Sequence, residues 1–339
     1  MDFMIDIDIA RPKEQIAYGD KILLIGSCFT EHIGNALNDA KFETLQNPNG
    51  ILFDPLSVCR SLVSYIEGMR YTEDDLFQLN EVWHSWRHHS RFSNVERARG
   101  LDSINRSQQL AHEFLKTADW LIITLGSSFS YRLSDNYGNG QTFVPSNDRS
   151  GDAVANCHRA PAQWFTKKML EIDVIISELD TVYHRLLQYN PALKIIFTVS
   201  PVRHIRDGVV ENNRSKARLL EAVHHITNKF GRVYYFPAYE LVIDVLRDYR
   251  FYDVDLVHPN YMATEFVLQK FSENYIADDS RLLMEQLQKI VIARKHKAFQ
   301  PDTKAHQEFL KNHYEKTRLL LERYPFLDLK EELVYFSRT

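Results

Sequence analysis

Short apolar runs alternate with longer amphipathic segments along most of the chain. Residues 21–27 read Lys-Ile-Leu-Leu-Ile-Gly-Ser, a run typical of a parallel strand buried on both faces. Similar runs predict four more strands, at residues 42–46, 120–126, 193–200 and 232–237. The segments between them predict helices at residues 31–40, 162–188 and 213–229. Strands that alternate with helices indicate an α/β fold, with a parallel sheet covered on both faces.

The predicted helix at residues 213–229 shows the clearest periodicity. Ala217, Leu220, Val223 and Ile226 recur every three residues and form one apolar helical face. We expect this face to pack on the sheet.

Two regions lie outside this minimal fold. Residues 51–118 separate two strands by far more than one crossover helix needs, and we interpret them as an insertion that leans over the substrate site. Residues 280–339 are rich in Leu, Lys, Glu and Gln and predict two or three helices, with Asp302 or Thr303 as a cap. This extension suits either a cap on the core or a homodimer contact. We therefore divide the chain into a domain at 1–279 and a helical extension at 280–339.

Composition narrows the class of protein. The 339 residues are 44% hydrophobic and 25% charged, as in ordinary globular proteins, and a net charge of −4 gives no support to nucleic-acid binding. Three scattered cysteines predict reduced thiols in a cytoplasmic protein rather than a disulfide framework. The acidic N-terminus does not resemble a signal peptide, and no apolar run is long enough to predict a membrane span. Nothing in the sequence predicts a cofactor.

The first predicted strand leads into a turn with two nucleophilic side chains. Gly26 permits a tight turn, and Ser27 and Cys28 then come at the carboxyl edge of the sheet, at the start of a helix. Unpaired backbone N–H groups and the helix dipole favour a thiolate or an oxyanion there. The segment therefore suits acyl transfer, although a buried strand followed by an ordinary turn would look the same.

A second motif lies far along the chain. Asp255 precedes His258 by three residues, just before a patterned segment that predicts a helix at 260–274. A carboxylate at this spacing can orient the imidazole, fix its tautomer and stabilise the imidazolium. With a nucleophile at the end of the first strand, the pair predicts a catalytic triad.

The motif Gly26-Ser-Cys-Phe29 resembles the signature of the GSCFA family, which is itself similar to the SGNH/GDSL hydrolases. The resemblance covers roughly residues 20–275. It implies a three-layer α/β/α, flavodoxin-like sheet with strand order 2-1-3-4-5. The other segments that carry it are Asn47-Pro-Asn-Gly50, Trp83-His-Ser85, His88-His-Ser90, Thr124-Leu-Gly126, Asn156-Cys-His158, Ser200-Pro-Val-Arg-His204 and Tyr249-Arg-Phe-Tyr252.

The resemblance also implies a nucleophile. Superposing the SGNH motif on residues 25–30 places the nucleophilic serine of those enzymes on Cys28, with Ser27 as the alternative. A thiol is the better intrinsic nucleophile, and a nearby imidazole or helix N-terminus can lower its pKa. A buried, inert cysteine is the other interpretation of Cys28.

The expected oxyanion site is only partly present. The resemblance assigns the Gly50 N–H to it, and Gly126 ends the third strand of the fold. Ser128 stands where SGNH enzymes carry an asparagine, and Asn156 is an alternative donor from another loop. Loss of one such donor typically costs about 2.7–4 kcal/mol of transition-state stabilisation.

Several further side chains are candidates for the substrate site. His84 and His88 have the spacing of a helical metal pair but lack the glutamate of His-Glu-x-x-His, so we predict substrate contacts for His84 and His89 and no metal site. Arg203, beyond a predicted strand, could bind an anionic substrate group, although an exposed loop arginine would look the same.

The sequence thus predicts an esterase or acyltransferase that acts on an ester or thioester of a carbohydrate or cell-wall-type metabolite. His258 would activate Cys28 or Ser27, and the acyl group would pass to water or to another acceptor. Two alternatives remain open at this point. One is a non-catalytic carbohydrate- or metabolite-binding protein on the same scaffold, and the other is a metal-dependent hydrolase that uses His84 and His88.

Overall fold

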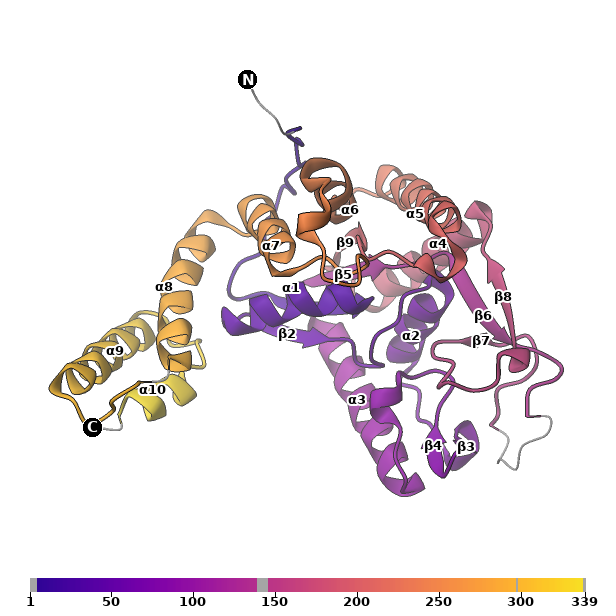
Figure 1. The fold of residues 1–339 in the computed structure, drawn as a ribbon, viewed down its shortest axis with the longest axis horizontal. Coiled ribbons are helices and arrows are strands. Elements are labelled where there is room, and N and C mark those ends of the chain that lie inside the picture. The colour runs from indigo at the N-terminus through magenta and orange to yellow at the C-terminus, as the bar shows by residue number, and fades with distance from the viewer. Residues whose placement is uncertain (1–4, 139–145, 297, 338–339) are drawn as a thin grey trace.

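The computed structural model describes residues 5–138, 146–296 and 298–337. At its centre is a sheet of five strands in the order β10-β9-β5-β1-β2, with every neighbouring pair parallel (Figure 1). Taken in chain order, these strands give the predicted arrangement 2-1-3-4-5, and all five predicted strands are confirmed. Their bounds are β1 Lys21–Gly26, β2 Glu43–Gln46, β5 Trp120–Leu125, β9 Lys194–Val199 and β10 Val233–Tyr235.

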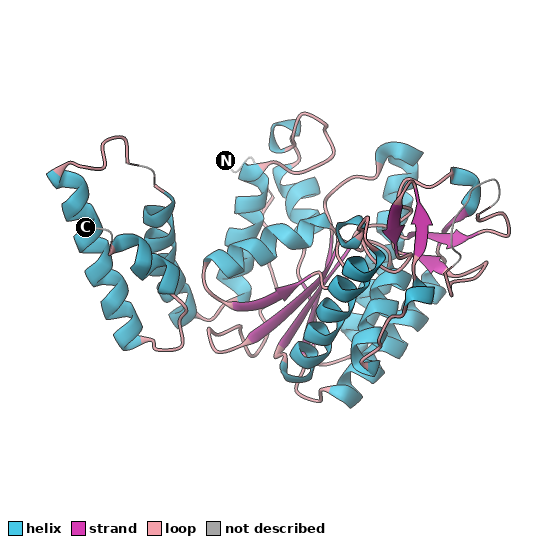
Figure 2. Cartoon of the chain, turned by 90° about the horizontal axis from the view of Figure 1, so that it is seen from below, coloured by secondary structure: helices cyan, strands magenta, loops and turns pink. Residues whose placement is uncertain are grey.

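The inner strands β1, β5 and β9 are buried on both faces. In β1, Ile22 and Leu24 point into one hydrophobic cluster, and Leu23 and Ile25 point into a second cluster across the sheet. Helices cover both faces, as Figure 2 shows. The helices of the first cluster are α1 Cys28–Asp39, α7 Tyr261–Tyr275 and α8 Asp278–Lys295, and those of the second are α2 Pro55–Glu67, α3 Arg97–Thr117, α4 Ile172–Tyr189 and α5 Val209–Lys229.

The buried face of α5 differs from the predicted one. Val223 and Ile226 are fully buried as expected, but Ala217 is exposed and Leu220 is only half-buried. The buried side chains nearer the start of the helix are instead Asn212, Ser215, Lys216, Leu219 and Ala222. The inward face of α5 is therefore apolar at its C-terminal end and polar at its N-terminal end.

The predicted helix at 162–188 is wrong over its first ten residues. They form a 3-10 turn at Ala162–Trp164 and the strand β8 Phe165–Met169, and α4 begins only at Ile172. The strand β8 pairs with β6 Phe129–Leu133, which also pairs with β7 Ala153–Val154. Strand pairing across more than thirty residues outweighs the weak local preference of Phe-Thr-Lys-Lys-Met.

Residues 51–118 contain both core helices and a small projecting unit. The helices α2 and α3 pack on the sheet, whereas β3 Phe77–Leu79 and β4 Val82–His84 form an antiparallel hairpin. Two 3-10 turns, Glu73–Asp75 and Ser90–Phe92, flank the hairpin. Phe77 stacks on Trp86 with 3.6 Å between ring centroids, and this pair anchors a separate apolar cluster.

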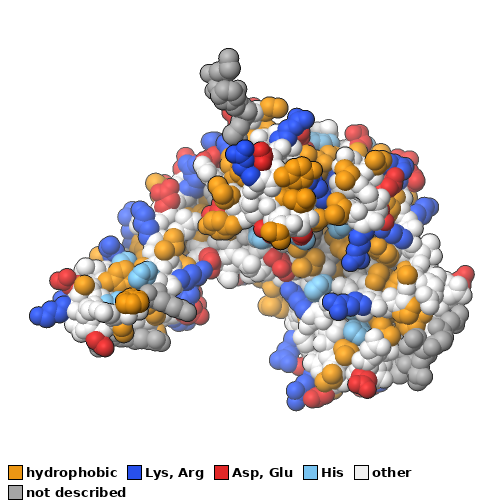
Figure 3. Space-filling model, viewed as in Figure 1, with side chains coloured by type: hydrophobic (Ala, Val, Ile, Leu, Met, Phe, Trp, Pro, Cys, Tyr) orange, Lys and Arg blue, Asp and Glu red, His pale blue; other side chains and the backbone are white. Residues whose placement is uncertain are grey.

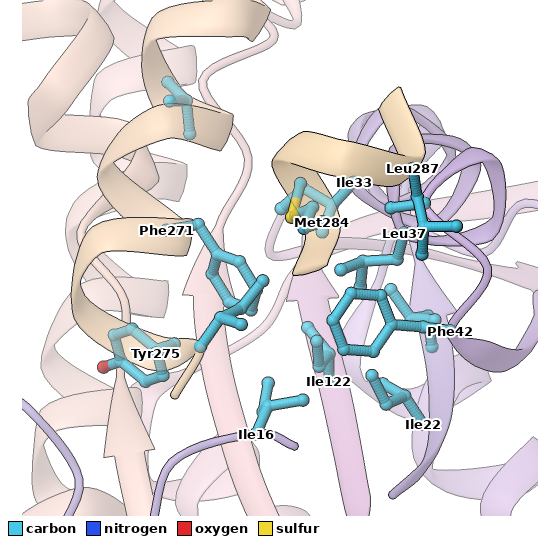
Figure 4. Close-up of a cluster of buried hydrophobic side chains, with 14 of the residues drawn as sticks. Ile16, Ile22, Ile33, Leu37, Phe42, Ile122, Phe271, Tyr275, Met284 and Leu287 are labelled. Atoms are coloured by element: carbon cyan, nitrogen blue, oxygen red, sulfur yellow. The ribbon is translucent and has the colours of Figure 1, made fainter. Parts of the chain in front are cut away.

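Three helices end the chain, namely α8, α9 Lys304–Arg323 and α10 Lys330–Phe336. The Thr303 hydroxyl caps α9 by accepting the His306 N–H, so the second of the two predicted caps is confirmed. Met284 and Leu287 of α8 lie against Ile33 and Phe42 in the first cluster (Figure 4). The C-terminal helices thus share the core of the sheet domain.

The N-terminal segment closes the same cluster. Ile16 is fully buried, its N–H donates to the Tyr275 carbonyl at 2.8 Å, and its carbonyl accepts the Ala277 N–H at 2.9 Å (Figure 4). It therefore forms a parallel bridge at the junction of α7 and α8.

Between β10 and α7 the chain runs through α6 Ala238–Glu240, a π-helical turn at Leu241–Leu246 and a 3-10 turn at Tyr249–Phe251. Positive and negative side chains are interspersed over the visible face, which is notched between the C-terminal helices and the region of α3, β3 and β4 (Figure 3). None of the described helices has the length and apolar character needed to cross a bilayer.

Candidate functional site

The turn after β1 has a geometry that only glycine allows. Gly26 has φ of +148°, and a Cβ atom there would lie 2.2 Å from the Thr124 carbonyl oxygen of β5. The Gly26 N–H donates to Asn47 Oδ1 at 2.9 Å, and the Ser27 N–H donates to the Thr124 carbonyl at 3.1 Å. These bonds fix Ser27 and Cys28 at the carboxyl edge of the sheet.

The two candidate nucleophiles differ in accessibility. Ser27 occupies the N-cap position of α1 but is only 3% exposed, and its hydroxyl has no hydrogen-bond partner among the described residues. Cys28 is the first residue of α1 and is half-buried. Of the two residues, Cys28 is therefore the more exposed, although its side chain also packs against the first cluster.

The thiol of Cys28 is the resting form of this side chain. Burial raises its pKa, and the Glu31 carboxylate adds to the rise. The backbone N–H groups of Phe29 and Cys28 and the positive charge of Lys216 oppose that rise. The net effect is that the pKa of Cys28 is raised. Attack on a carbonyl therefore needs a base that removes the thiol proton.

The Asp255–His258 pair forms as its spacing predicted. Asp255 Oδ2 lies 2.6 Å from His258 Nδ1, and Asp255 Oδ1 accepts the backbone N–H groups of Val257 and His258 at 2.9 and 3.0 Å. The bond from the imidazole and these two amides lower the pKa of Asp255 to about 2. No other described residue binds the imidazole, so Nε2 remains available to accept a proton.

Arg203 holds the loop that carries this pair. Its guanidinium lies 4.2 Å from the Tyr252 ring centroid and donates to the Leu256 carbonyl at 3.4 Å. The backbone N–H of Arg203 donates to the Val257 carbonyl at 3.2 Å. These contacts connect the end of β9 to the Asp255–His258 loop.

Charged and titratable side chains converge around Cys28. His32 follows Cys28 by four residues on α1, so the two side chains share a helix face. Burial lowers the pKa of His32, Glu31 opposes this, and His258 lowers the pKa further. Burial lowers the pKa of His204 to about 4, with Lys216 as the next cause and His258 as a smaller one. His258 therefore influences the pKa of a side chain on α1 and of one in the segment after β9.

The polar end of α5 reaches the same edge of the sheet. Asn212 Oδ1 accepts the His204 N–H at 2.8 Å, and Ser215 Oγ accepts the Ser128 N–H at 2.8 Å. Lys216 Nζ donates to the carbonyls of Gly126 and Ser200, both at 2.6 Å. Sequence reasoning missed these α5 residues, although a lysine inside the buried face of a helix is itself a signal.

The residues proposed for the oxyanion site are engaged elsewhere. The Gly50 N–H donates to the Asn47 carbonyl at 2.7 Å, and the Gly126 N–H donates to the Phe53 carbonyl at 2.8 Å. Ser128 is fully buried and lies beside Ser215, with 3.1 Å between their hydroxyl oxygens. Asn156 Oδ1 accepts the His158 N–H at 2.8 Å. The first backbone N–H groups of α1 have no partner within that helix and lie beside the thiol.

The histidines of residues 51–118 are not aligned on a helix. His84 ends β4 and contacts Ser93 Oγ at 2.7 Å, and its ring centroid lies 4.6 Å from that of His158. His88 is buried in the turn that follows and contacts Ser85 Oγ at 2.9 Å. Burial lowers the pKa of both His88 and His158 to about 3.

His89 lies closer to the β1 edge. The Cβ position of Gly50 would be 2.2 Å from His89 Cβ, so the two residues are packed together.

Within the described part of the chain, no three His, Cys, Asp or Glu side chains are grouped so that they could hold a metal ion.

Comparison with known proteins gives two matches to family models. The GSCFA family model matches residues 21–271, and the model described as GSCFA domain protein, C-terminal domain, matches residues 287–339. No curated protein matches the chain significantly.

Solved structures show a distant likeness. A carbohydrate esterase family 3 protein from Talaromyces cellulolyticus is 10% identical with a TM-score of 0.36, over 78% of this chain and 99% of that one. An acetyl xylan esterase from Butyrivibrio proteoclasticus is 13% identical with a TM-score of 0.35, over 76% of this chain and 63% of that one. An acetyl esterase mutant with an acetate ion is 11% identical with a TM-score of 0.31, over 79% and 99%.

Proposed function

Because the chain belongs to the GSCFA family, whose model covers both Cys28 and His258, we propose that it is an acyl-group hydrolase or transferase. The proposed substrate is an ester or thioester of a carbohydrate or cell-wall-type metabolite. The observation that carries the proposal is the Asp255–His258 pair. Asp255 binds His258 Nδ1, so Nε2 of the same imidazole can act as a general base. The greater exposure of Cys28, at the start of α1, supports it as the nucleophile.

The proposed reaction has two steps. His258 Nε2 takes the Cys28 proton while Sγ bonds to the carbonyl carbon, and the carbonyl oxygen becomes an oxyanion. The carbon then releases the alkoxide or thiolate, which takes the proton from His258, and a thioester remains on Cys28. Water or an acceptor hydroxyl or amine, deprotonated by His258, attacks the thioester and frees the thiol.

The oxyanion needs hydrogen-bond donors. The first N–H groups of α1 lie beside the thiol and are the donors that the geometry supports best. Gly50 and Asn156 remain proposed donors. The Gly50 N–H would have to exchange its bond to the Asn47 carbonyl, whereas Asn156 would donate from its side-chain Nδ2, because its bond to the His158 N–H uses Oδ1.

A non-catalytic binding protein has less support. That alternative places the aromatic side chains of residues 51–118 on a binding surface. Trp86 is instead fully buried and stacks on Phe77, and the Tyr71 ring is also buried. These rings serve the packing of the hairpin region.

Hydrolysis of p-nitrophenyl acetate and of an acyl thioester tests the proposal. We expect Cys28→Ala to lose turnover, and His258→Ala and Asp255→Asn to reduce kcat by about 10²–10⁴-fold, the range of a general base. Ser27→Ala is the matched control and should keep most of the activity. Full activity in both Cys28→Ala and His258→Ala would overturn the proposal, and loss in Ser27→Ala alone would move the nucleophile to Ser27.

A further inference from the structure

Lys216 is a buried cation without an acidic partner. Its side chain is 1% exposed, and its Nζ donates to two backbone carbonyls, those of Gly126 and Ser200. Neither acceptor carries a formal charge, and no described carboxylate forms an ion pair with Lys216. An ammonium has three N–H donors, so one remains after these two bonds. A buried charge of this kind is unfavourable unless an opposite charge compensates it.

The position of Lys216 suggests where that opposite charge forms. Gly126 and Ser200 directly follow β5 and β9, and β1, which leads to Cys28, is the other neighbour of β5. A Cβ at Gly126 would lie 3.3 Å from the Ser27 Cβ. The ammonium therefore lies beside the turn that presents the thiol.

Lys216 and Cys28 influence each other electrostatically. Burial lowers the pKa of Lys216 to about 7, and Cys28 is the described group whose charge opposes this. Lys216 in turn lowers the pKa of Cys28. Of the other neighbours, Glu31 of α1 acts on the thiol, while His204 and the Tyr239 ring of α6 face Lys216 without negative charge. His258 acts on His204 from the loop before α7.

We propose that Lys216 is a positioning residue whose ammonium group stabilises the thiolate of Cys28. This inference rests on the proposed function, and it deepens that function by assigning the charge that favours Cys28 over Ser27 as nucleophile. When the S–H bond breaks, the proton goes to His258 Nε2 and the electron pair stays on sulfur, opposite the Lys216 ammonium. No group is oxidised or reduced.

Alkylation of Cys28 by iodoacetamide tests the proposal. Its rate is followed from pH 5 to 10 by peptide mass spectrometry, which separates Cys28 from Cys59 and Cys157. Lys216→Met keeps the length of the buried chain and removes its charge, and Lys229→Met is the control, because Lys229 lies on the same helix but is exposed. We expect Lys216→Met to slow alkylation most near pH 5, where Lys216 carries its full charge, by about tenfold for a coupling of one pKa unit, and to have little effect above pH 8, where the lysine is neutral. Lys229→Met should stay within twofold of the wild type.

An unchanged alkylation profile in folded Lys216→Met would overturn the proposal. If that variant does not fold, a reciprocal experiment decides, because the coupling between two titrating groups is mutual. The pKa of Lys216, followed by NMR of ¹³C-labelled lysine, should be higher in Cys28→Asp, which places a negative charge where the thiolate would form, than in the uncharged Cys28→Ser, and an equal value in the two variants would reject the coupling. Neither measurement uses an acyl substrate, so an inactive esterase assay contradicts only the proposed function.

Discussion

At the residue scale, the buried face of α5 contributes both to the core and to the candidate site. Leu219, Val223 and Ile226 hold the helix on the sheet, whereas Ser215 and Lys216 on the same face bind groups at the strand ends. A helix that precedes a parallel strand begins at the carboxyl edge of the sheet, where ligands bind in this class of fold. The buried polar residues of α5 therefore belong to the candidate site as well as to the core.

Lys216 should make the stability of the protein depend on pH. Its pKa is about 7 in the folded state, because burial disfavours the ammonium, and about 10.4 in an unfolded chain. Between these values the unfolded state binds more protons, so the free energy of unfolding rises with pH. The destabilisation is complete below pH 7 and absent above about pH 10.4. Urea unfolding from pH 6 to 10 should show this rise in the wild type relative to Lys216→Met, and parallel curves for the two proteins would refute it.

At the element scale, the passage from β1 to α1 depends on Gly26. A side chain there meets the Thr124 carbonyl of the neighbouring strand and also requires an unfavourable φ. We expect Gly26→Ala to lower the free energy of unfolding by about 2 kcal/mol or more, measured by urea denaturation. Gly19→Ala is the control, because Gly19 is exposed and has no atom within 4 Å of its Cβ position. Equal stability of the two variants would contradict this account of the turn.

The elements also show what the sequence can predict. The strands β1, β5 and β9 were predictable because each contains a continuous apolar run, and the Asp255–His258 contact was predictable because both residues lie in one short loop. The strand β8 was not predictable, because it forms by pairing with β6. A local sequence pattern carries no information about such pairing. Lys216 was missed for a different reason. It lies on the helix face that the apolar periodicity predicted, four residues before Leu220 and seven before Val223, but a polar side chain within that face was not interpreted as part of a site.

At the scale of the whole molecule, a buried ion cluster joins the last helix to the sheet domain. Glu332 of α10 is fully buried and lies 3.0 Å from Lys41 Nζ and 3.2 Å from Arg294 Nε. Its neighbour Glu331 also pairs with Arg294, but its side chain is 73% exposed.

These adjacent glutamates provide a matched pair of variants. Glu332→Gln should lower the free energy of unfolding by about 3 kcal/mol, because it removes a fully buried carboxylate charge from its ion pairs with the partly buried Lys41 and Arg294. Glu331→Gln should change it by less than about 1 kcal/mol, since exposed ion pairs contribute little. Urea denaturation monitored by tryptophan fluorescence measures both, and equal effects would show that the buried cluster does not stabilise the C-terminal helices.

The bridge at Ile16 also constrains how the protein is made. Next to this bridge, the Tyr18 N–H binds the hydroxyl of Ser280, 262 residues later in the chain. A ribosome needs on the order of tens of seconds to synthesise that length. During this time Ile16 and the α1 side of the sheet lack their covering helices, so the nascent chain presents an apolar surface to chaperones and proteases. The domain can complete its fold only after nearly all of the chain has left the ribosome.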